Sequence, residues 1–147
     1  MVCIYCGHKT VVANSRYKKK NAVVWRRRLC THCGAITTTF EEYDYSTALV
    51  VKKRSGALQA FQKDKLLLSI AKATEHRQGS TQAASELTTT IISRILKQKP
   101  IQTTILSKDI SSVASLVLKH YDAASAVKYL SFQAPTNLSR DIRKMLQ

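Results

Sequence analysis

Cys3-Ile4-Tyr5-Cys6 and Cys30-Thr31-His32-Cys33 are the two stretches that decide the fold of the first part of the chain. They contain all four cysteines of the 147-residue protein. A Cys-x-x-Cys pair places two thiolates on one tight turn, and two such turns facing each other form the tetrahedral sulfur cage that suits Zn²⁺. The loop between the pairs is slightly longer than in the usual zinc pattern, which a hairpin tolerates. The sequence therefore predicts a zinc site made by Cys3, Cys6, Cys30 and Cys33.

Two histidines near the cysteines, His8 and His32, are also possible metal ligands by residue type. Four cysteines already complete a tetrahedral site, so we expect both histidines to be exposed neighbours. A catalytic zinc keeps an open coordination position, and four thiolates leave none. The predicted zinc is structural, because so small a piece of chain buries too little apolar surface to fold alone.

Short β-branched segments around the cysteine pairs predict three antiparallel strands. The expected strands are Thr10–Ala13, Ala22–Leu29 and Ile36–Phe40. The polar residues 14–16 and 18–21 are expected to form a turn. Gly7 and Gly34, one after each pair, would supply the unusual backbone angles of the two cysteine knuckles. Three strands with two such knuckles form a zinc ribbon.

The charge of the chain is strongly basic and unevenly distributed. Its net charge is +15 and its pI is about 10.0, which predicts polyanionic partners such as nucleic acid, nucleotides or acidic lipid. All nine acidic residues lie after residue 40. The cysteine-containing part is therefore the better candidate for contact with a phosphate backbone.

The second predicted strand contains Trp25 followed by three arginines. Successive side chains of a strand point to opposite faces, so Arg26 and Arg28 share one face while Trp25 and Arg27 share the other. A row of guanidinium groups could then meet phosphates, or the arginines could form a solvated edge that prevents aggregation. The absence of acids favours nucleic acid. For Trp25, stacking on a base and packing on the ribbon both remain open.

An acidic patch at residues 41–46 marks a boundary, and the following sequence predicts a β-hairpin and four helices. The expected hairpin strands are Ala48–Arg54 and Ala57–Phe61, and the expected helices are Lys63–Arg77, residues 80–99, a helix from residue 107, and residues 123–133. Ser80 and Ser107 are expected N-caps. The predicted fold class is α+β, with a zinc ribbon over residues 1–46, a hairpin-and-helix domain over 47–137 and a polar tail over 138–147.

Basic residues of the hairpin suggest a second site. Lys52, Lys53 and Arg54 end a strand and Lys65 opens the first helix, so these cations could converge on an anion near a helix amino terminus. The alternative is a solvated basic hairpin. No Walker-type glycine loop, carboxylate pair or Ser-His-Asp set is evident, so we do not expect an enzyme.

Several motifs occur in a fixed order along the chain. They are Cys3-x-x-Cys6-Gly7, Ser15-Arg16, Arg26-Arg27-Arg28-x-Cys30-x-x-Cys33, Thr38-Thr39-Phe40-Glu41, Val51-Lys52-Lys53-Arg54-Ser55-Gly56, Phe61, Lys65-Leu66 and Ala73-x-Glu75-x-Arg77. In this order they resemble the NrdR family, bacterial repressors of ribonucleotide reductase genes, over almost the whole chain. The motifs from Val51 to Leu66 are similar to the opening of an ATP-cone, and Ala73-x-Glu75-x-Arg77 fits the end of the first helix of that domain. Two departures are Trp25, where the family usually has the first of four arginines, and Ala126, where a tyrosine is expected.

The resemblance implies a repressor whose ribbon binds double-stranded promoter DNA and whose ATP-cone binds ATP or dATP. It also implies a homo-oligomer whose assembly depends on the nucleotide. By motif position, Val51, Lys53, Arg54 and Lys65 would hold the nucleotide. Arg16, Arg26, Arg27 and Arg28 would contact DNA. The alternative is a zinc-ribbon module that binds RNA or the transcription or translation machinery without nucleotide control.

The sequence also predicts where the protein works. No apolar run approaches the length of a membrane span, and the chain begins directly with a cysteine pair rather than a signal peptide. We therefore expect a soluble protein of a reducing cytosol that is not associated with a membrane. The resemblance implies that this is the bacterial cytoplasm, with the protein associated with the nucleoid. In that compartment, paired cysteines favour metal ligation over disulfides.

Overall fold

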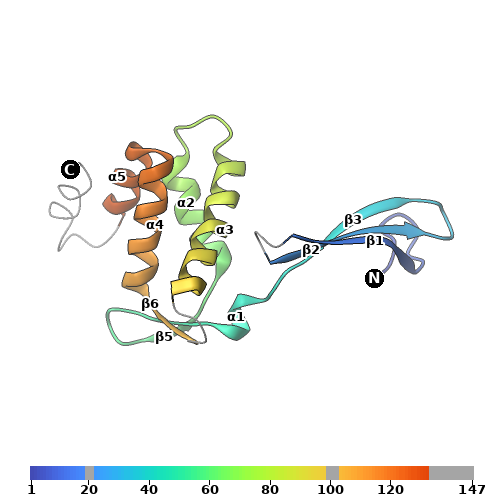
Figure 1. Cartoon of the computed structure of the whole chain (residues 1–147), viewed down its shortest axis with the longest axis horizontal. Coiled ribbons are helices and arrows are strands. Elements are labelled where there is room, and N and C mark those ends of the chain that lie inside the picture. Colours follow the sequence, from blue (N-terminus) through green and yellow to red (C-terminus); the bar gives the residue numbers. More distant parts are fainter. Residues whose placement is uncertain (19–21, 99–102, 133–147) are drawn as a thin grey trace. The chain divides into compact units, whose positions relative to one another are not determined.

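The computed structural model describes residues 1–18, 22–98 and 103–132 (Figure 1). The chain divides into two compact units, Met1–Asp44 and Tyr45–Gln147. The first unit is a small antiparallel sheet with a cysteine cluster, and the second combines helices with a small sheet. The predicted α+β class is confirmed. Among the described residues, no helix is both long and apolar enough to cross a membrane.

The sheet of the first unit has the order β1-β2-β3, with both pairs antiparallel. Its strands are β1 (Thr10–Lys18), β2 (Val23–Cys30) and β3 (Ile36–Glu41). The expected polar turn at residues 14–16 is wrong, because β1 continues through it to Lys18. A bulge between Val12 and Asn14 shifts the register, after which the polar residues pair normally with β2. Residues 19–21 of the expected turn lie outside the described residues.

Almost nothing in the first unit is buried. Among its described residues, only Cys3 and Cys30 are buried, at 3% and 0% exposed. All residues of β1 after Thr10 are exposed. The sheet therefore has no hydrophobic core of its own, and the cysteine cluster is where its chain segments converge.

The sheet of the second unit has the order β5-β4-β6. The predicted hairpin is present as β4 (Val50–Lys52) and β5 (Leu58–Ala60), which pair antiparallel. A third strand, β6 (Thr104–Leu106), pairs parallel with β4. It was not predicted, since three residues give no periodic signal and their partner strand is far away in the sequence. The short helix α1 (Tyr45–Ala48) was also missed.

Four longer helices follow the hairpin, as predicted. They are α2 (Lys63–Thr74), α3 (Ser80–Gln98), α4 (Ser107–Tyr121) and α5 (Ala123–Ser131). The expected caps are wrong: Ser80 and Ser107 are the first helical residues, and Leu106 occupies the N-cap position of α4. The first helix ends at Thr74 rather than Arg77. The expected end of the last helix at residue 133 and the tail over 138–147 fall outside the described residues.

The hydrophobic core lies within the second unit. Helix α2 packs on α3 and α5, and α4 packs on the same two helices. The side chains of Ile70, Ile91, Ile105 and Leu118 are at most 1% exposed. Val51 of β4 and Phe61, which follows β5, belong to the same core cluster. The hairpin is therefore fixed to the helices at the positions where the sequence predicts a nucleotide site.

Candidate functional site

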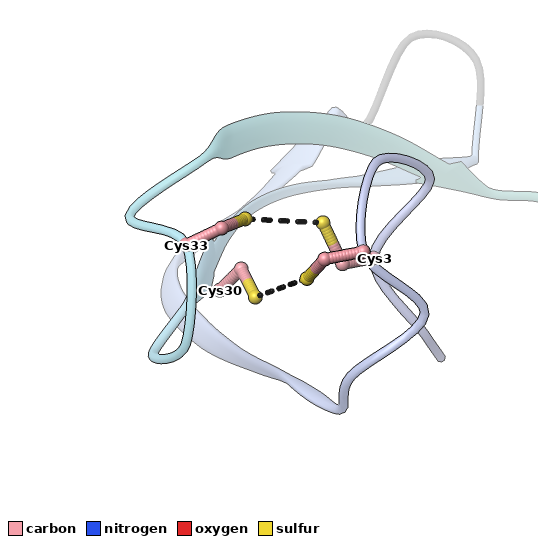
Figure 2. Close-up of side chains that lie close together, drawn as sticks. Cys3, Cys30 and Cys33 are labelled. Carbon is pink, nitrogen blue, oxygen red and sulfur yellow. Dashed lines mark hydrogen bonds between the residues drawn. The ribbon is translucent and has the colours of Figure 1, made fainter.

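The four cysteines converge at one end of the first unit (Figure 2). The Sγ atoms of Cys3 and Cys33 lie 3.7 Å apart, and those of Cys6 and Cys30 lie 3.5 Å apart. All four sulfurs lie within 4.8 Å of one another, and none is in a disulfide. A tetrahedral zinc site with Zn–S bonds of about 2.3 Å separates its sulfurs by about 3.8 Å. The geometry therefore fits Zn²⁺ held by four thiolates.

The two knuckles have the same backbone hydrogen bonds. The Gly7 N–H donates to the Cys3 carbonyl at 3.0 Å, and the Gly34 N–H donates to the Cys30 carbonyl at 2.9 Å. Both glycines have positive φ, 73° and 72°, which other residues adopt only with strain. This conformation turns each cysteine pair toward the same point, as the sequence predicts.

Backbone amides and neighbouring sulfurs shift the pKa of three of the thiols. Hydrogen bonds from the Tyr5 and Cys6 amides lower the pKa of Cys3. The Cys33 amide lowers the pKa of Cys30 to about 6. At Cys6, the His8 amide favours the thiolate, but burial and the three other sulfurs outweigh it and raise the pKa to about 12. The cluster thus holds thiolates readily at some positions, while full deprotonation requires a cation among the sulfurs.

His8 and His32 are exposed beside the cluster. Their rings stack with centroids 3.7 Å apart and planes inclined by 3°. His8 Nδ1 lies 3.0 Å from the Cys6 carbonyl oxygen, with which it hydrogen-bonds. Both imidazoles come within 4.8 Å of the Cys6 sulfur, yet the four sulfurs already form a closed set.

The predicted DNA-contacting arginines divide between the two faces of the ribbon sheet. Arg26 and Arg28 share one face, where Arg26 forms an ion pair with Glu41 at 2.8 Å and Arg28 donates to the Thr39 hydroxyl at 3.1 Å. The pairing with Glu41 had no signal in the strand pattern, since it depends on the register of β2 and β3. Arg26 is therefore partly neutralised on its face.

Arg16 and Arg27 lie on the opposite face. Arg27 shares this face with Trp25, two residues before it on β2, and Arg16 of β1 pairs with Trp25. The Arg16 guanidinium lies over the Trp25 indole, 5.9 Å from the ring centroid. Arg27 is exposed and forms no ion pair or side-chain hydrogen bond with any described residue. Trp25 is half-buried, so it both packs on the ribbon and remains accessible.

A cavity of about 240 Å³ lies between the hairpin and the helices of the second unit. Three of the four residues predicted to hold a nucleotide, Val51, Lys53 and Lys65, line it. Arg54 does not line the cavity and is exposed in the hairpin turn that follows Lys53. The structure therefore brings two of the predicted cations to one cavity, as expected of an anion site.

Two helix amino termini lie at this cavity. Gln62, the N-cap of α2, and Ser107, the first residue of α4, both line it. The N-cap residues of both helices, Gln62 and Leu106, make no side-chain hydrogen bond to the helix. The amino terminus of a helix attracts phosphate, and the two lysines add positive charge.

The remaining lining residues were not foreseen. They include Ser69, Ser107, Ser111 and Tyr129. They come from α2, α4 and α5, and only folding brings them together. Tyr129 lies three positions after Ala126 on the same helix, and both are buried. The helical spacing of these two positions is the one signal that could have pointed to Tyr129.

Comparisons with known proteins match both units. Residues 1–41 match the family model described as "Transcriptional repressor NrdR-like, N-terminal domain", and residues 49–134 match that of the ATP cone domain. A protein named Transcriptional repressor NrdR from Heliobacterium modesticaldum is 31% identical over 99% of this chain and 95% of its own length. Proteins of the same name from Caulobacter vibrioides and Acetivibrio thermocellus are 30% and 32% identical over 99% of this chain, and over 92% and 98% of their own lengths.

Proposed function

The chain belongs to the NrdR family of transcriptional repressors, and from this premise we propose that it binds promoter DNA through its zinc ribbon under the control of ATP or dATP. The role of the family is regulatory rather than enzymatic. The observation that supports the proposal most directly is the pairing of a four-thiol ribbon, rich in arginine and free of acids up to residue 40, with a lysine-lined cavity in the ATP-cone.

The ribbon is the proposed DNA-binding part. Bound Zn²⁺ would supply a fixed cross-link between the two knuckles, held by Cys3, Cys6, Cys30 and Cys33. The chain's own strands then present the guanidinium groups, which neutralise phosphates and release counterions. The proposed contacts are Arg16, Arg26, Arg27 and Arg28. The target is double-stranded promoter DNA of ribonucleotide reductase genes.

The cavity of the second unit is the proposed nucleotide site. Lys53 and Lys65 would bind the phosphates together with the amides at the start of α2 and α4. Val51 contributes apolar surface to the cavity lining, and Tyr129 adds an aromatic ring. Arg54, in the hairpin turn, would reach a phosphate only from outside this cavity.

Nucleotide binding would change how subunits associate, and only some homo-oligomers would present their ribbons correctly to DNA. The proposed setting is the bacterial cytoplasm, at the nucleoid. This part of the proposal rests on the family and on the presence of an ATP-cone.

Light scattering and DNA retardation with ATP, dATP or no nucleotide test the proposal. We expect nucleotide to change both the mass of the oligomer and its affinity for a reductase-gene promoter. Lys53→Ala should abolish the response, while Lys52→Ala is a matched control because Lys52 is its neighbour and does not line the cavity. Indifference of both mass and affinity to nucleotide would refute the regulatory half. Tight RNA binding without a nucleotide response would favour a different kind of ribbon protein.

A further inference from the structure

The ribbon sheet has one face on which aromatic and basic side chains meet. In the register of the sheet, Trp25 lies directly between Arg16 on β1 and Phe40 on β3. Lys18 and Arg27 lie on the same face, because Lys18 pairs with Val23 and residues 23, 25 and 27 of β2 alternate together. We call these five residues, Arg16, Lys18, Trp25, Arg27 and Phe40, the Trp25 face.

The rings of the Trp25 face are accessible. Phe40 is 62% exposed, although it is a large aromatic residue of a paired strand. Val11 and Ile36, at 49% and 55% exposed, lie on the same face but are separated from Phe40 by the polar row of Arg27. Phe40 and Trp25 are cross-strand neighbours, so the exposed ring and the half-buried ring together offer apolar surface that a partner could cover.

Each ring has a cation over it. The Lys18 ammonium lies 5.5 Å from the centroid of the Phe40 ring, and the Arg16 guanidinium lies 5.9 Å from that of Trp25. Arg27 adds a third exposed positive charge. The acidic residue of β3, Glu41, follows Phe40 but lies on the other face of the sheet, where it pairs with Arg26. The Trp25 face thus combines flat rings with positive charge.

This combination matches one class of ligand. A nucleotide carries its phosphate close to its base, so a protein that binds unpaired nucleotides needs a ring for the base and a neighbouring cation for the phosphate. Bases in a duplex are already stacked on each other and cannot offer their flat faces to a ring. We propose that the Trp25 face binds single-stranded nucleic acid by stacking unpaired bases on Phe40 and Trp25. This site shares Arg16 and Arg27 with the duplex contacts proposed above, and the stacking on Phe40 and Trp25 is additional to them.

Trp25 is the only tryptophan of the chain, so its fluorescence reports on this face directly. The full-length zinc-loaded protein is titrated with oligothymidylate and oligouridylate of about twelve nucleotides, with a duplex of equal length and with inorganic polyphosphate. We expect both single strands to quench Trp25, whereas polyphosphate binds to the cations without quenching. Binding of either single strand that is tighter than binding of the duplex supports the proposal. Whichever of the two single strands binds more tightly shows whether DNA or RNA is the source of the bases.

A pair of variants isolates the stacking. Phe40→Leu keeps an apolar side chain but removes the ring, and we expect single-strand binding to weaken by about 5- to 150-fold, as for the loss of one stacked base. Tyr17→Leu is the matched control, because Tyr17 is also an exposed aromatic residue of the sheet, at 60%, but pairs with Val24 on the opposite face. Its binding should change by no more than about twofold.

Two results would overturn the proposal. One is an equal effect of Phe40→Leu and Tyr17→Leu on single-strand binding. The other is a duplex that quenches Trp25 as strongly as the single strands do, with Phe40→Leu reducing both effects equally. In that case the Trp25 face would be a groove contact for duplex DNA. Circular dichroism and zinc content of each variant establish that the ribbon has remained folded, so neither result can be attributed to unfolding.

Discussion

Removal of the zinc should unfold the ribbon and leave the ATP-cone intact. Among the described residues of the first unit only Cys3 and Cys30 are buried, and both are proposed ligands. The hydrophobic core cluster, by contrast, draws every member from the second unit. Within the described part of the first unit, the sulfur cluster is thus the only place where chain segments are held together away from water.

The expected effect is large. Structural zinc in small domains contributes an apparent free energy of about 10–16 kcal/mol at neutral pH. The free energy of unfolding of a whole domain is typically about 5–15 kcal/mol. Loss of the metal therefore removes at least as much free energy as stabilises the folded ribbon. The second unit loses none of its buried contacts and should keep its unfolding transition.

Two optical signals separate the units. Trp25 on β2 is the only tryptophan, so its emission reports on the ribbon alone. All the described helices lie in the second unit, so the helical circular dichroism reports on that unit. Chelation of the zinc, or Cys30→Ser, should shift the tryptophan emission to longer wavelength and expose residues 1–44 to protease, while the helical signal remains. Thr31→Ser, at an exposed knuckle position, is the matched control.

The opposite result would refute the reasoning. If protein shown by metal analysis to lack zinc retained a blue-shifted tryptophan emission and a protease-resistant first unit, the ribbon would be stable without metal. A loss of the helical signal together with the tryptophan shift would also contradict it, since the two units would then unfold as one.

Three further predictions concern charge, packing and pH. Glu41→Gln removes the partner of Arg26 and should steepen the salt dependence of DNA binding, log affinity against log salt, by up to about 0.9; an unchanged slope would mean that Arg26 makes no phosphate contact. Leu118→Ala, at a site that is 0% exposed, should lower the unfolding free energy of the second unit by about 2–5 kcal/mol in urea denaturation, and a loss below about 1 kcal/mol would contradict the packing described. Hydrogen bonds from the Ser125 hydroxyl and amide lower the pKa of Asp122 to about 2 from an ordinary 3.8, so its contribution is present above pH 3.8 and lost as the pH falls through about 2. Acid titration of Asp122→Asn should therefore lack part of this pH dependence, and identical acid transitions would argue against it.

The features predicted correctly from the sequence are those that neighbouring residues specify. Each cysteine knuckle is encoded within five residues, by two cysteines and a glycine with positive φ. The hairpin and the longer helices follow from local periodicity. Local patterns did not predict that β1 extends to Lys18, because its polar residues are held by pairing with β2 and show no apolar alternation.

The nucleotide cavity shows why the rest could not be predicted. Lys53 and Lys65 were suggested by their positions near the hairpin and the start of a helix. Ser111 and Tyr129 come from helices that reach the cavity only through packing. The strand β6 pairs in parallel with β4, and two helices separate these strands in the sequence. Non-local contacts of this kind leave no periodic trace in a single sequence.

The lack of a core in the ribbon limits how nucleotide control could operate. A change of affinity within one ribbon would require two alternative packings of its side chains, and the described residues of the first unit offer no packed interior to rearrange. The knuckles are fixed by the sulfur cluster and by hydrogen bonds of 2.8–3.0 Å. A nucleotide bound near Lys53 would therefore act by changing how many ribbons are joined and how they are spaced. In that case nucleotide should alter the affinity for a promoter with several sites, whereas a single ribbon on a single site should bind equally well with either nucleotide.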